Sequence, residues 1–525
     1  MSVSDRRPGG SFPEPEPEPA SGAARGTTAA PTDQPPTDAH PRRWLALLFI
    51  GMAQLMIVLD ITIVNIALPS AQRDLDISAG DRQWVITAYT LAFGSLLLFG
   101  GRIADYTGRR RAFVIGLLGF AGASALGGAA ESLGTLLAAR ALQGVFAALL
   151  APSALSLLAV MFTEAKERAK AFGVFGAIAA GGGALGLVLG GLLTEYLNWR
   201  WCLYVNVPIA VAAVFGWYAL PADTRTSGSR ARFDIPGVLL AVSGLVAVVY
   251  GCSEAEADGW DSGRVIGLLA AGVLLLAVFV AVERRVSTPL LPLRVVLDRT
   301  RGGAYLAVGL AMVGMFAMFL FLTYYLQTVK DYSAVVTGVA FLPLTAGVLF
   351  GAGGIATRLL PRVPPRALVA PGLLLAAAGA AWLIPLEPDS SYAAGVLPAE
   401  LLVGTGMGLV MAPAMNYATY GVRPEDTGIA SASVTTAQQI GGSIGTALLN
   451  TIAASTTSDY LSAHRPPTPD VARQALTEGF SDAFVAASLI LVAAAAVVGA
   501  LMNTPRPSRD ADARTDAQPM APHLG

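Results

Sequence analysis

Three ionisable residues, Asp60, Arg140 and Glu400, lie within stretches of the sequence that are otherwise largely apolar. Desolvation disfavours the charged form of a carboxyl group and raises its affinity for a proton, whereas a nearby arginine favours the charged form. A movement that changes the distance between Asp60 and Arg140 would therefore load or release a proton. This pattern predicts proton coupling by Asp60 and Arg140, with Glu400 as a further candidate.

Each of these residues also has a structural interpretation. Asp60 can instead be a structural carboxylate that is permanently paired with Arg140. Arg140 can extend its long side chain to the outer surface of a membrane. Glu400 can cap the outer end of its helix. These alternatives stay open at the level of the sequence.

Polar and aromatic residues in the same apolar stretches are candidates for lining a substrate cavity. Hydrogen bonds between helices explain each of them individually as well. They are Gln54, Asn65, Tyr89, Gln143, Asn206, Tyr324, Tyr325, Gln327, Asn416, Gln438 and Gln439.

The composition indicates that a bilayer surrounds most of the chain. Of its 525 residues, 54% are apolar and only 14% are charged, whereas soluble proteins average roughly 25% charged residues. A net charge of −1 provides no basic surface for nucleic acid, so we expect no nucleic-acid partner. Lysine is scarce beside abundant Arg, Ala, Gly and Pro, which is typical of a GC-rich bacterial genome and favours the bacterial cytoplasmic (inner) membrane.

Apolar runs long enough to span a bilayer, about 20 residues each, recur along the chain. We expect an all-α membrane protein with fourteen transmembrane helices. The runs lie near residues 44–68, 84–101, 112–130, 135–160, 169–193, 201–220, 235–252, 265–282, 303–326, 335–355, 368–386, 395–417, 430–454 and 482–501.

Charge placement and a faint internal repeat predict how these helices are organised. Arginine and lysine gather in alternate loops, which indicates that both termini are cytoplasmic. The repeated Ala-Pro pairs, Ala151-Pro152 and Ala412-Pro413, predict two six-helix bundles, a common transporter plan. The expected parts are a disordered cytoplasmic tail over 1–41, the first bundle over 42–221, a linker with two inserted helices over 222–292, the second bundle over 293–503 and a second tail over 504–525.

The sequence contains no pattern for metal, cofactor or ATP chemistry. His40, His464 and His523 lie in polar or terminal segments, so we expect no metal site inside the membrane. No GxxxxGK[ST] loop is present, which argues against ATP as the energy source. Neither paired aspartates at helix ends nor a buried nucleophile beside a histidine is present, so the sequence does not predict an enzyme.

Glycines at regular positions predict a sharp loop and a flat helix face. In GRIADYTGRRR (101–111), Gly101 and Gly108 permit a tight turn, and Asp105 can accept from helix-end N–H groups or pair with Arg109. The alternative interpretation of this loop is a plain hairpin that its arginines hold in the cytoplasm. In the fifth run, small residues at every fourth position allow close helix packing; they are Gly182, Gly186 and Gly190.

Four stretches in order carry a resemblance to a known family. They are LDITIVNIALP (59–69), QWVITAYTLAFGSLLLFGGRIADYTGRRR (83–111), RALQG (140–144) and NWRWCLYVNVP (198–208). Together they resemble the major facilitator superfamily, in particular its fourteen-span drug:proton antiporter branch of quaternary-ammonium and multidrug exporters, over residues 42–503.

The resemblance implies a secondary active transporter that works by alternating access as a monomer. It would export lipophilic drugs or antibiotics, including cationic ones, in exchange for protons, and the 101–109 loop would latch the two bundles in one gating state. One departure concerns coupling, because Leu187 follows Gly186 where the family usually has proline. Proton-coupled uptake or export of a specific metabolite, or a non-transporting sensor, remains an alternative on the same fold.

Overall fold

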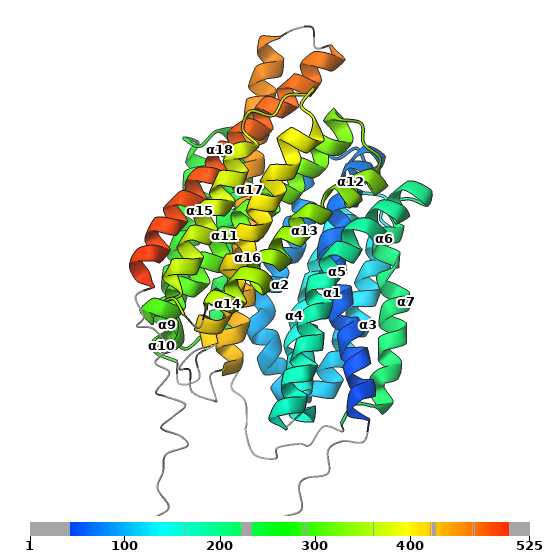
Figure 1. Ribbon diagram of the computed structural model, residues 1–525, viewed down its shortest axis with the longest axis vertical. Helices are drawn as coiled ribbons and strands as arrows, with labels where there is room; N and C mark the ends of the chain where they lie inside the picture. The colour runs from blue at the N-terminus through cyan, green and yellow to red at the C-terminus, as the bar shows by residue number, and fades with distance from the viewer. Residues whose placement is uncertain are drawn as a thin grey trace, which may run out of the picture. The chain divides into compact units, whose positions relative to one another are not determined.

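The computed structural model describes residues 42–502, apart from residues 163, 222–233, 287–288, 290, 361, 420–421, 423–426, 465 and 467. All regular elements among these residues are helical. The longer helices run side by side (Figure 1). Helices satisfy their own backbone hydrogen bonds, which is what a segment inside a bilayer requires.

The first part of the chain, up to residue 221, forms seven α-helices and two short 3₁₀ turns. They are α1 (Arg43–Asp74), η1 (Asp81–Gln83), α2 (Trp84–Thr107), α3 (Arg109–Gly128), α4 (Leu133–Met161), α5 (Ala165–Tyr196), α6 (Trp201–Tyr204), α7 (Asn206–Val214) and η2 (Phe215–Tyr218). The short elements α6, α7 and η2 follow one another closely and together make one candidate span, Trp201–Tyr218.

The second part begins with a helical hairpin and continues with a longer series that includes three π-helical segments. The elements are α8 (Ile235–Asp258), α9 (Gly263–Glu283), α10 (Leu293–Val296), α11 (Arg299–Tyr324), η3 (Tyr325–Val329), α12 (Ala334–Ala340), α13 (Leu342–Leu349), η4 (Phe350–Ala356), α14 (Thr357–Leu359), α15 (Arg366–Trp382), η5 (Tyr392–Val396), α16 (Leu397–Thr419), α17 (Thr427–Ala463) and α18 (Pro469–Leu501).

The prediction of fourteen membrane spans is wrong. Within the described residues, twelve helices are long and apolar enough to cross a membrane. The expected run 368–386 corresponds to α15, which ends at Trp382 after 17 residues, about 25 Å against a hydrocarbon core of about 30 Å. The expected run 430–454 corresponds to α17, which is 37 residues long but contains the polar segment SASVTTAQQIGGSIGT (431–446).

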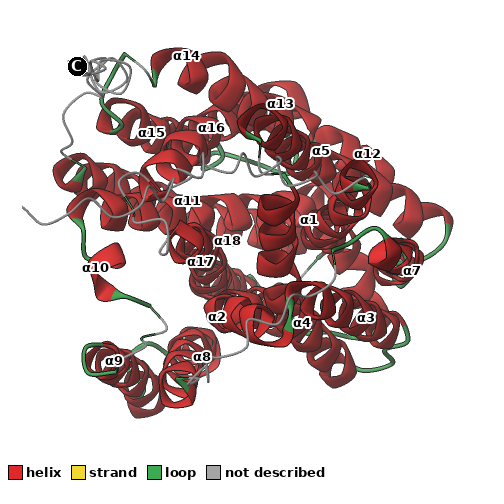
Figure 2. Cartoon of the chain, turned by 90° about the horizontal axis from the view of Figure 1, so that it is seen from below, coloured by secondary structure: helices red, strands yellow, loops and turns green. Residues whose placement is uncertain are grey.

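The α8–α9 hairpin lies at the edge of the described helices, beside α2 (Figure 2). Asp234 caps α8 by accepting a hydrogen bond from the N–H of Gly237 (2.9 Å), and Gly259, with φ of 82°, ends it. Helix α8 packs against α2 and α17 as well as α9. Only 17% of the most apolar window of α9 is buried within the protein, so α9 presents most of its surface outward.

Helix α1 connects two hydrophobic cores. Its first half, represented by Ile50 and Met56, packs with α2, α3, α4 and α7. Its second half, represented by Ile63 and Ile66, belongs instead to a core that includes α11, α16 and α18. Asp60 lies where the helix passes from one core to the other.

Candidate functional site

Asp60 and Arg140 form an ion pair in the interior of the protein. The Nη1 atom of Arg140, on α4, lies 2.6 Å from Oδ2 of Asp60, on α1. The side chain of Asp60 is fully buried and that of Arg140 is 2% exposed. Arg140 therefore points into the bundle and does not extend to the outer surface.

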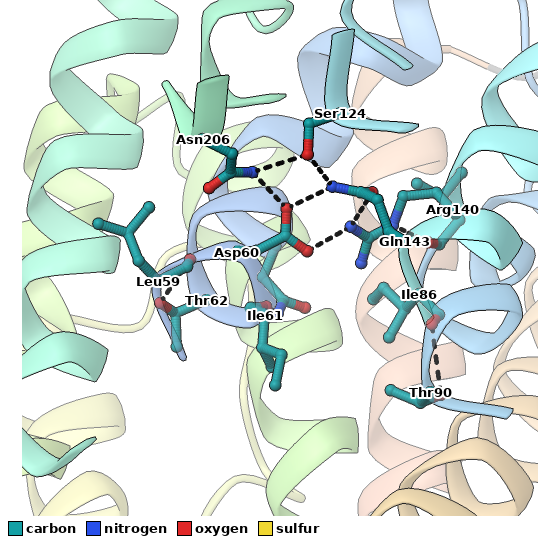
Figure 3. Close-up of polar contacts among 12 residues, drawn as sticks. Leu59, Asp60, Ile61, Thr62, Ile86, Thr90, Ser124, Arg140, Gln143 and Asn206 are labelled. Atoms are coloured by element: carbon teal, nitrogen blue, oxygen red, sulfur yellow. Dashed lines mark hydrogen bonds and ion pairs between the residues drawn. The ribbon is translucent and has the colours of Figure 1, made fainter. Parts of the chain in front are cut away.

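Two amides complete the surroundings of the Asp60 carboxylate (Figure 3). Gln143 Nε2 donates to Asp60 Oδ1 at 2.9 Å, and Asn206 Nδ2 donates to the same oxygen at 2.8 Å. Gln143 also donates to the hydroxyl of Ser124 at 2.7 Å. We call Asp60, Arg140, Gln143, Asn206 and Ser124 the Asp60 cluster; its members come from α1, α3, α4 and α7.

Further contacts fix the orientation of the arginine. Arg140 Nε donates to the carbonyl of Val85 at 2.9 Å, and its Nη1 also donates to Gln143 Oε1 at 2.8 Å. The guanidinium carbon lies 4.6 Å from the centre of the Tyr89 ring, a cation–π contact. The planar guanidinium thus holds three partners at once, which a lysine ammonium cannot reproduce in the same geometry.

The RALQG motif explains why α4 can bring these groups to α1 and α2. Arg140 and Gln143 are three residues apart and therefore share one face of the helix. Gly144 lies against the backbone of α2 at Tyr89, and an added Cβ there would also come within 2.8 Å of the Ala92 side chain. Glycine at this position lets α2 and α4 approach closely enough for Arg140 to reach Val85.

The chemistry available to the cluster is the binding of one proton. As arranged here, the Asp60 carboxylate accepts from Arg140, Gln143 and Asn206, so both of its oxygens have donors. Protonation removes the ionic attraction to Arg140 and leaves that charge in a low-dielectric interior. Gain of a proton would therefore favour a rearrangement of α1 relative to α4.

A narrow cavity adjoins the cluster. It has a volume of about 10 Å³, room for roughly one water molecule. Arg140, Val64 and Trp199 are among its lining residues. The space is too small for a drug-sized molecule in this conformation.

The other predicted cavity residues on α1 and α2 are not part of the cluster. Asn65 is buried and donates to the carbonyl of Ile61 at 2.7 Å on its own helix. Gln54 is half-buried. Tyr89 is buried and packs against Arg140 and Phe120.

Three predicted residues around the end of α11 contact other segments instead of a shared cavity. The hydroxyl of Tyr324 donates to Gln72 Oε1 on α1. Gln327 Nε2 donates to the carbonyl of Ile66, also on α1, at 2.9 Å. The hydroxyl of Tyr325 donates to the carbonyl of Glu387 at 2.8 Å.

Predicted residues on α16 and α17 also lie apart from the Asp60 cluster. Asn416 is exposed. Gln438 is half-buried, with Nε2 lying 3.5 Å from the sulfur of Met411. Glu400 is fully buried, and its Oε2 lies 3.3 Å from the hydroxyl oxygen of Tyr392.

The predicted 101–109 loop is a tight junction between α2 and α3. Gly108, with φ of 101°, ends α2 and precedes α3; a side chain is rarely tolerated in that conformation. Gly101 lies near Pro152 of α4, and Arg109 is half-buried. The backbone of Asp105 belongs to α2, whereas its side chain lies outside the described residues.

The three glycines of α5 face α1. A Cβ added at Gly182 would come within 3.1 Å of Leu55, and one at Gly190 within 2.9 Å of Ile63. At Gly186 it would meet Thr62. Close backbone approach between α1 and α5 therefore depends on this face.

Two members of the Asp60 cluster differ in how readily the sequence identifies them as site candidates. Asn206 is noticeable as an amide in an apolar run. Ser124 carries no such signal, because it is one small residue within the Ala- and Gly-rich segment GFAGASALGG (119–128). Its proximity to Gln143 and Asn206 depends on how α3 packs against α4 and α7.

Comparison with solved structures shows the fold. A bacterial homologue of the human lysosomal transporter Spinster, in an inward-facing and unoccupied conformation, superimposes with a TM-score of 0.62. The match covers 88% of this chain and 97% of that one, at 17% sequence identity. The same type of protein in an inward-facing and occupied conformation gives a TM-score of 0.61.

Sequence comparison finds much closer relatives. The puromycin resistance protein pur8 of Streptomyces alboniger is 54% identical over 92% of this chain and 96% of its own length. The cephamycin export protein CmcT of Amycolatopsis lactamdurans is 38% identical over 87% and 92%, respectively. The tetracenomycin C resistance and export protein of Streptomyces glaucescens is 35% identical over 81% and 78%.

A family model agrees with the four motifs and with these relatives. The model of the Major Facilitator Superfamily matches residues 50–446. This range contains Asp60, Arg140 and Asn206, as well as the 101–109 loop. The resemblance predicted from the sequence is thereby confirmed, and the chain is a multi-pass membrane protein that belongs to the major facilitator superfamily of transporters.

Proposed function

We propose that the protein exports antibiotics or similar lipophilic compounds across the cytoplasmic membrane of a bacterium in exchange for protons. The observation that carries this proposal is the buried Asp60–Arg140 ion pair at membrane depth, with an N···O distance of 2.6 Å. Ionisable residues inside a membrane are costly and mark ion pathways. The resistance and export names of relatives up to 54% identical support the direction and the class of substrate.

The geometry of the Asp60 cluster supports this proposal of proton coupling. Ionised Asp60 binds Arg140 on α4 and Asn206 on α7, which holds three helices together. Protonated Asp60 attracts Arg140 less, so α1 gains freedom to move. A proton arriving from outside and leaving inside would thereby alternate the protein between two conformations.

One inward proton supplies about 2.3 kcal/mol per 100 mV of membrane potential and about 1.4 kcal/mol per pH unit. At ordinary bacterial energisation this sustains roughly a hundredfold to a thousandfold gradient of a neutral substrate. The proposal therefore requires only one proton for substantial export.

Contacts between the predicted bundles support alternating access. Arg82 Nε donates to Asn450 Oδ1 at 3.0 Å, and the hydroxyls of Thr90 and Ser443 are 2.7 Å apart. Both pairs join α2 or its preceding turn to α17. These two pairs and the contacts of Tyr324 and Gln327 with α1 lie toward the same end of the bundle. The arginine distribution predicts that this end is external. We propose that this is a state closed to the outside, with both termini cytoplasmic.

The 101–109 loop fits a role in the opposite gate. Gly108 allows the sharp α2–α3 junction, and Arg102 donates to the carbonyl of Pro289 in the segment after α9. We propose that this loop changes its contacts when the cytoplasmic side closes. One chain contains every residue in this scheme, so a monomer suffices.

Puromycin is the first substrate to test, because of the 54% identical resistance protein. A strain lacking this gene should become more sensitive to puromycin, and expression in a sensitive host should restore resistance. Inverted membrane vesicles with an imposed pH gradient should concentrate labelled puromycin and lose that ability when an ionophore removes the gradient. Accumulation outside the cell distinguishes export from uptake, and any uphill movement distinguishes a transporter from a sensor. Unchanged sensitivity together with no gradient-driven movement of unrelated antibiotics would contradict the proposal.

A further inference from the structure

Glu400 is a second buried carboxyl group, in the α16 helix and away from the Asp60 cluster. Its side chain has no exposure to solvent. Among the described residues, its Oε1 atom has no hydrogen-bond partner, and Oε2 faces the Tyr392 hydroxyl. The backbone N–H of Leu344, on α13, also lies against the group. Because the π-helical segment η5 leads directly into α16, Glu400 does not cap a free helix end.

The hydrogen bonds of Tyr392 indicate which form of Glu400 fits. A phenol has a single hydrogen to donate. The shorter bond of this hydroxyl, 2.6 Å, goes to the carbonyl of Ala340, which can only accept. The phenol hydrogen cannot serve the 3.3 Å contact with Glu400 Oε2 equally well, whereas a protonated carboxyl group could donate to the phenol oxygen there.

The helices next to Glu400 pack closely against one another. One turn further along α16, Gly404 lies directly against the backbone of α13 at Leu344, and Gly408 lies against Val348. From the other side, a Cβ added at Gly347 would come within 3.0 Å of the Leu401 carbonyl. In the described part of the chain, no group of His, Cys, Asp and Glu could hold a metal ion.

A route from Glu400 to water runs through Tyr392. Tyr392 is half-buried at the first position of η5, and the preceding Ser391 is exposed. π-Helical turns inside longer helices are frequent at functional sites. Besides Glu400, the titratable group that acts on Tyr392 is Tyr332, and the carboxylates of the preceding loop, Glu387 and Asp389, are exposed.

The same hydroxyl connects Glu400 to the contact between the predicted bundles. Ala340 is the last residue of α12, and α12 packs against α5. There, a Cβ added at Gly191 would come within 2.7 Å of the Val335 backbone. An ionised Glu400 would draw the Tyr392 hydroxyl away from Ala340 and leave that carbonyl without its donor. The charge of Glu400 is thereby linked to the α5–α12 contact.

We propose that Glu400 is a second proton-binding site of the transport cycle, exchanging with the external solution through Tyr392. In the release step, the carboxyl proton passes to the phenol oxygen while the phenol proton leaves to water. The products are the Glu400 carboxylate and one hydronium ion, so the charge is balanced. The phenol then donates to the new carboxylate. This inference rests on the proposed function, and it raises the expected coupling from one proton to two protons per substrate.

The first test detects the proton itself and needs no transport. Infrared difference spectra of the purified protein in lipid nanodiscs, recorded across a pH titration, should contain a C=O band of a protonated carboxyl group. The band should disappear in Glu400→Gln, whose amide resembles the neutral acid in shape. It should persist in Glu387→Gln, a matched control because Glu387 is an exposed carboxylate in the same region. An unchanged band in Glu400→Gln would overturn the proposal.

The second test measures stoichiometry. In vesicles with labelled puromycin and an entrapped pH dye, the parent and Glu387→Gln should exchange two protons per drug and Glu400→Gln one. Loss of one proton lowers the maximal drug gradient roughly fiftyfold at 100 mV. Tyr392→Phe should retain the infrared band while slowing exchange of its proton. If the parent moves no protons with drug, the proposed function fails, whereas equal stoichiometry in the parent and Glu400→Gln rejects the role of Glu400 alone.

Discussion

The two buried carboxyl groups differ in how completely the protein surrounds them. Asp60 accepts from Arg140, Gln143 and Asn206, so its charge is matched by a cation and by two amides. Glu400 has only a phenol and the backbone N–H of Leu344 against it, and one of its oxygens has no partner among the described residues. The first environment supplies a cation and two amide donors to a carboxylate, whereas in our proposal the second holds a protonated carboxyl group.

This difference has a mechanical consequence. The Asp60 cluster joins four helices of the first part of the chain, so a change in its charge acts on the packing of α1. The Glu400 contact acts on α12 through a single hydroxyl.

Removing Arg140, the cation beside Asp60, should destabilise the protein far more than replacing Glu400 does. Arg140→Met leaves a buried, uncompensated carboxylate and should destabilise the protein by about 3–5 kcal/mol. Glu400→Gln replaces a neutral acid with a neutral amide and should cost about 1 kcal/mol or less. Thermal unfolding of the two purified variants in detergent measures the contrast. Equal losses of stability in the two variants would mean that the carboxyl groups of Asp60 and Glu400 do not differ in charge.

Keeping the charge at residue 140 while changing its shape should impair transport and preserve folding. Arg140→Lys cannot bind Val85, Asp60 and Gln143 together, so the transport rate should fall roughly tenfold or more. The matched control is Arg200→Lys, because Arg200 pairs with Asp74 at 2.5 Å but is partly exposed. Drug transport in vesicles, normalised to the amount of protein in the membrane, is the measurement. Full activity of Arg140→Lys would show that the guanidinium geometry is unimportant.

The packing of α1, which carries Asp60, should depend on one face of α5. Gly190→Ala places a Cβ within about 3 Å of three atoms of Ile63, including its backbone, and should cost about 1–3 kcal/mol. Gly183→Ala on the same helix meets no atom within 4 Å and gains the same helix propensity, so it is the control. Thermal unfolding compares them. A Gly190→Ala variant as stable as Gly183→Ala would contradict the close α1–α5 contact.

The smallest expected effect concerns Ser124, which touches the amides but not the carboxylate. Ser124→Ala removes one of the two acceptors of Gln143 Nε2 and should lower stability by about 1 kcal/mol. Transport should fall less than in Arg140→Lys, because Gln143 and Asn206 still donate to Asp60. Parallel assays of the two variants provide the comparison. A larger defect in Ser124→Ala than in Arg140→Lys would assign Ser124 a direct role.

Sequence reasoning located the ion pair because helix geometry converts residue counts into depth. Asp60 and Arg140 are each isolated charges in apolar runs, and 1.5 Å per residue places them at similar depth. It also identified Gln143 and Asn206 as polar residues of interest. Ser124 was not recoverable, since nothing distinguishes it from other small residues until α3 packs against α4.

The number of membrane spans was overestimated because the apolar windows extended beyond actual helix ends or included polar residues. The run at 368–386 continues past Trp382, where α15 ends. The run at 430–454 includes the Ser-, Thr- and Gln-rich part of α17. Likewise, Tyr324 and Gln327 were expected in a cavity, but they hydrogen-bond to α1. Such contacts depend on how distant helices pack in one conformation, which a local pattern does not specify.

The central claim is that Asp60 couples proton movement to export. The most direct measurement uses vesicles containing the parent or Asp60→Asn, with labelled puromycin and internal pH followed together under an imposed pH gradient. Asparagine is nearly isosteric and retains an acceptor for Arg140, but it leaves the arginine charge without a counter-ion, so transport by Asp60→Asn is normalised to the amount of protein in the membrane. The variant should neither move protons with the drug nor hold more than the passive drug distribution, whereas the parent should reach a gradient of roughly a hundredfold or more. Accumulation by Asp60→Asn as steep as in the parent, with the same proton flux, would contradict the account.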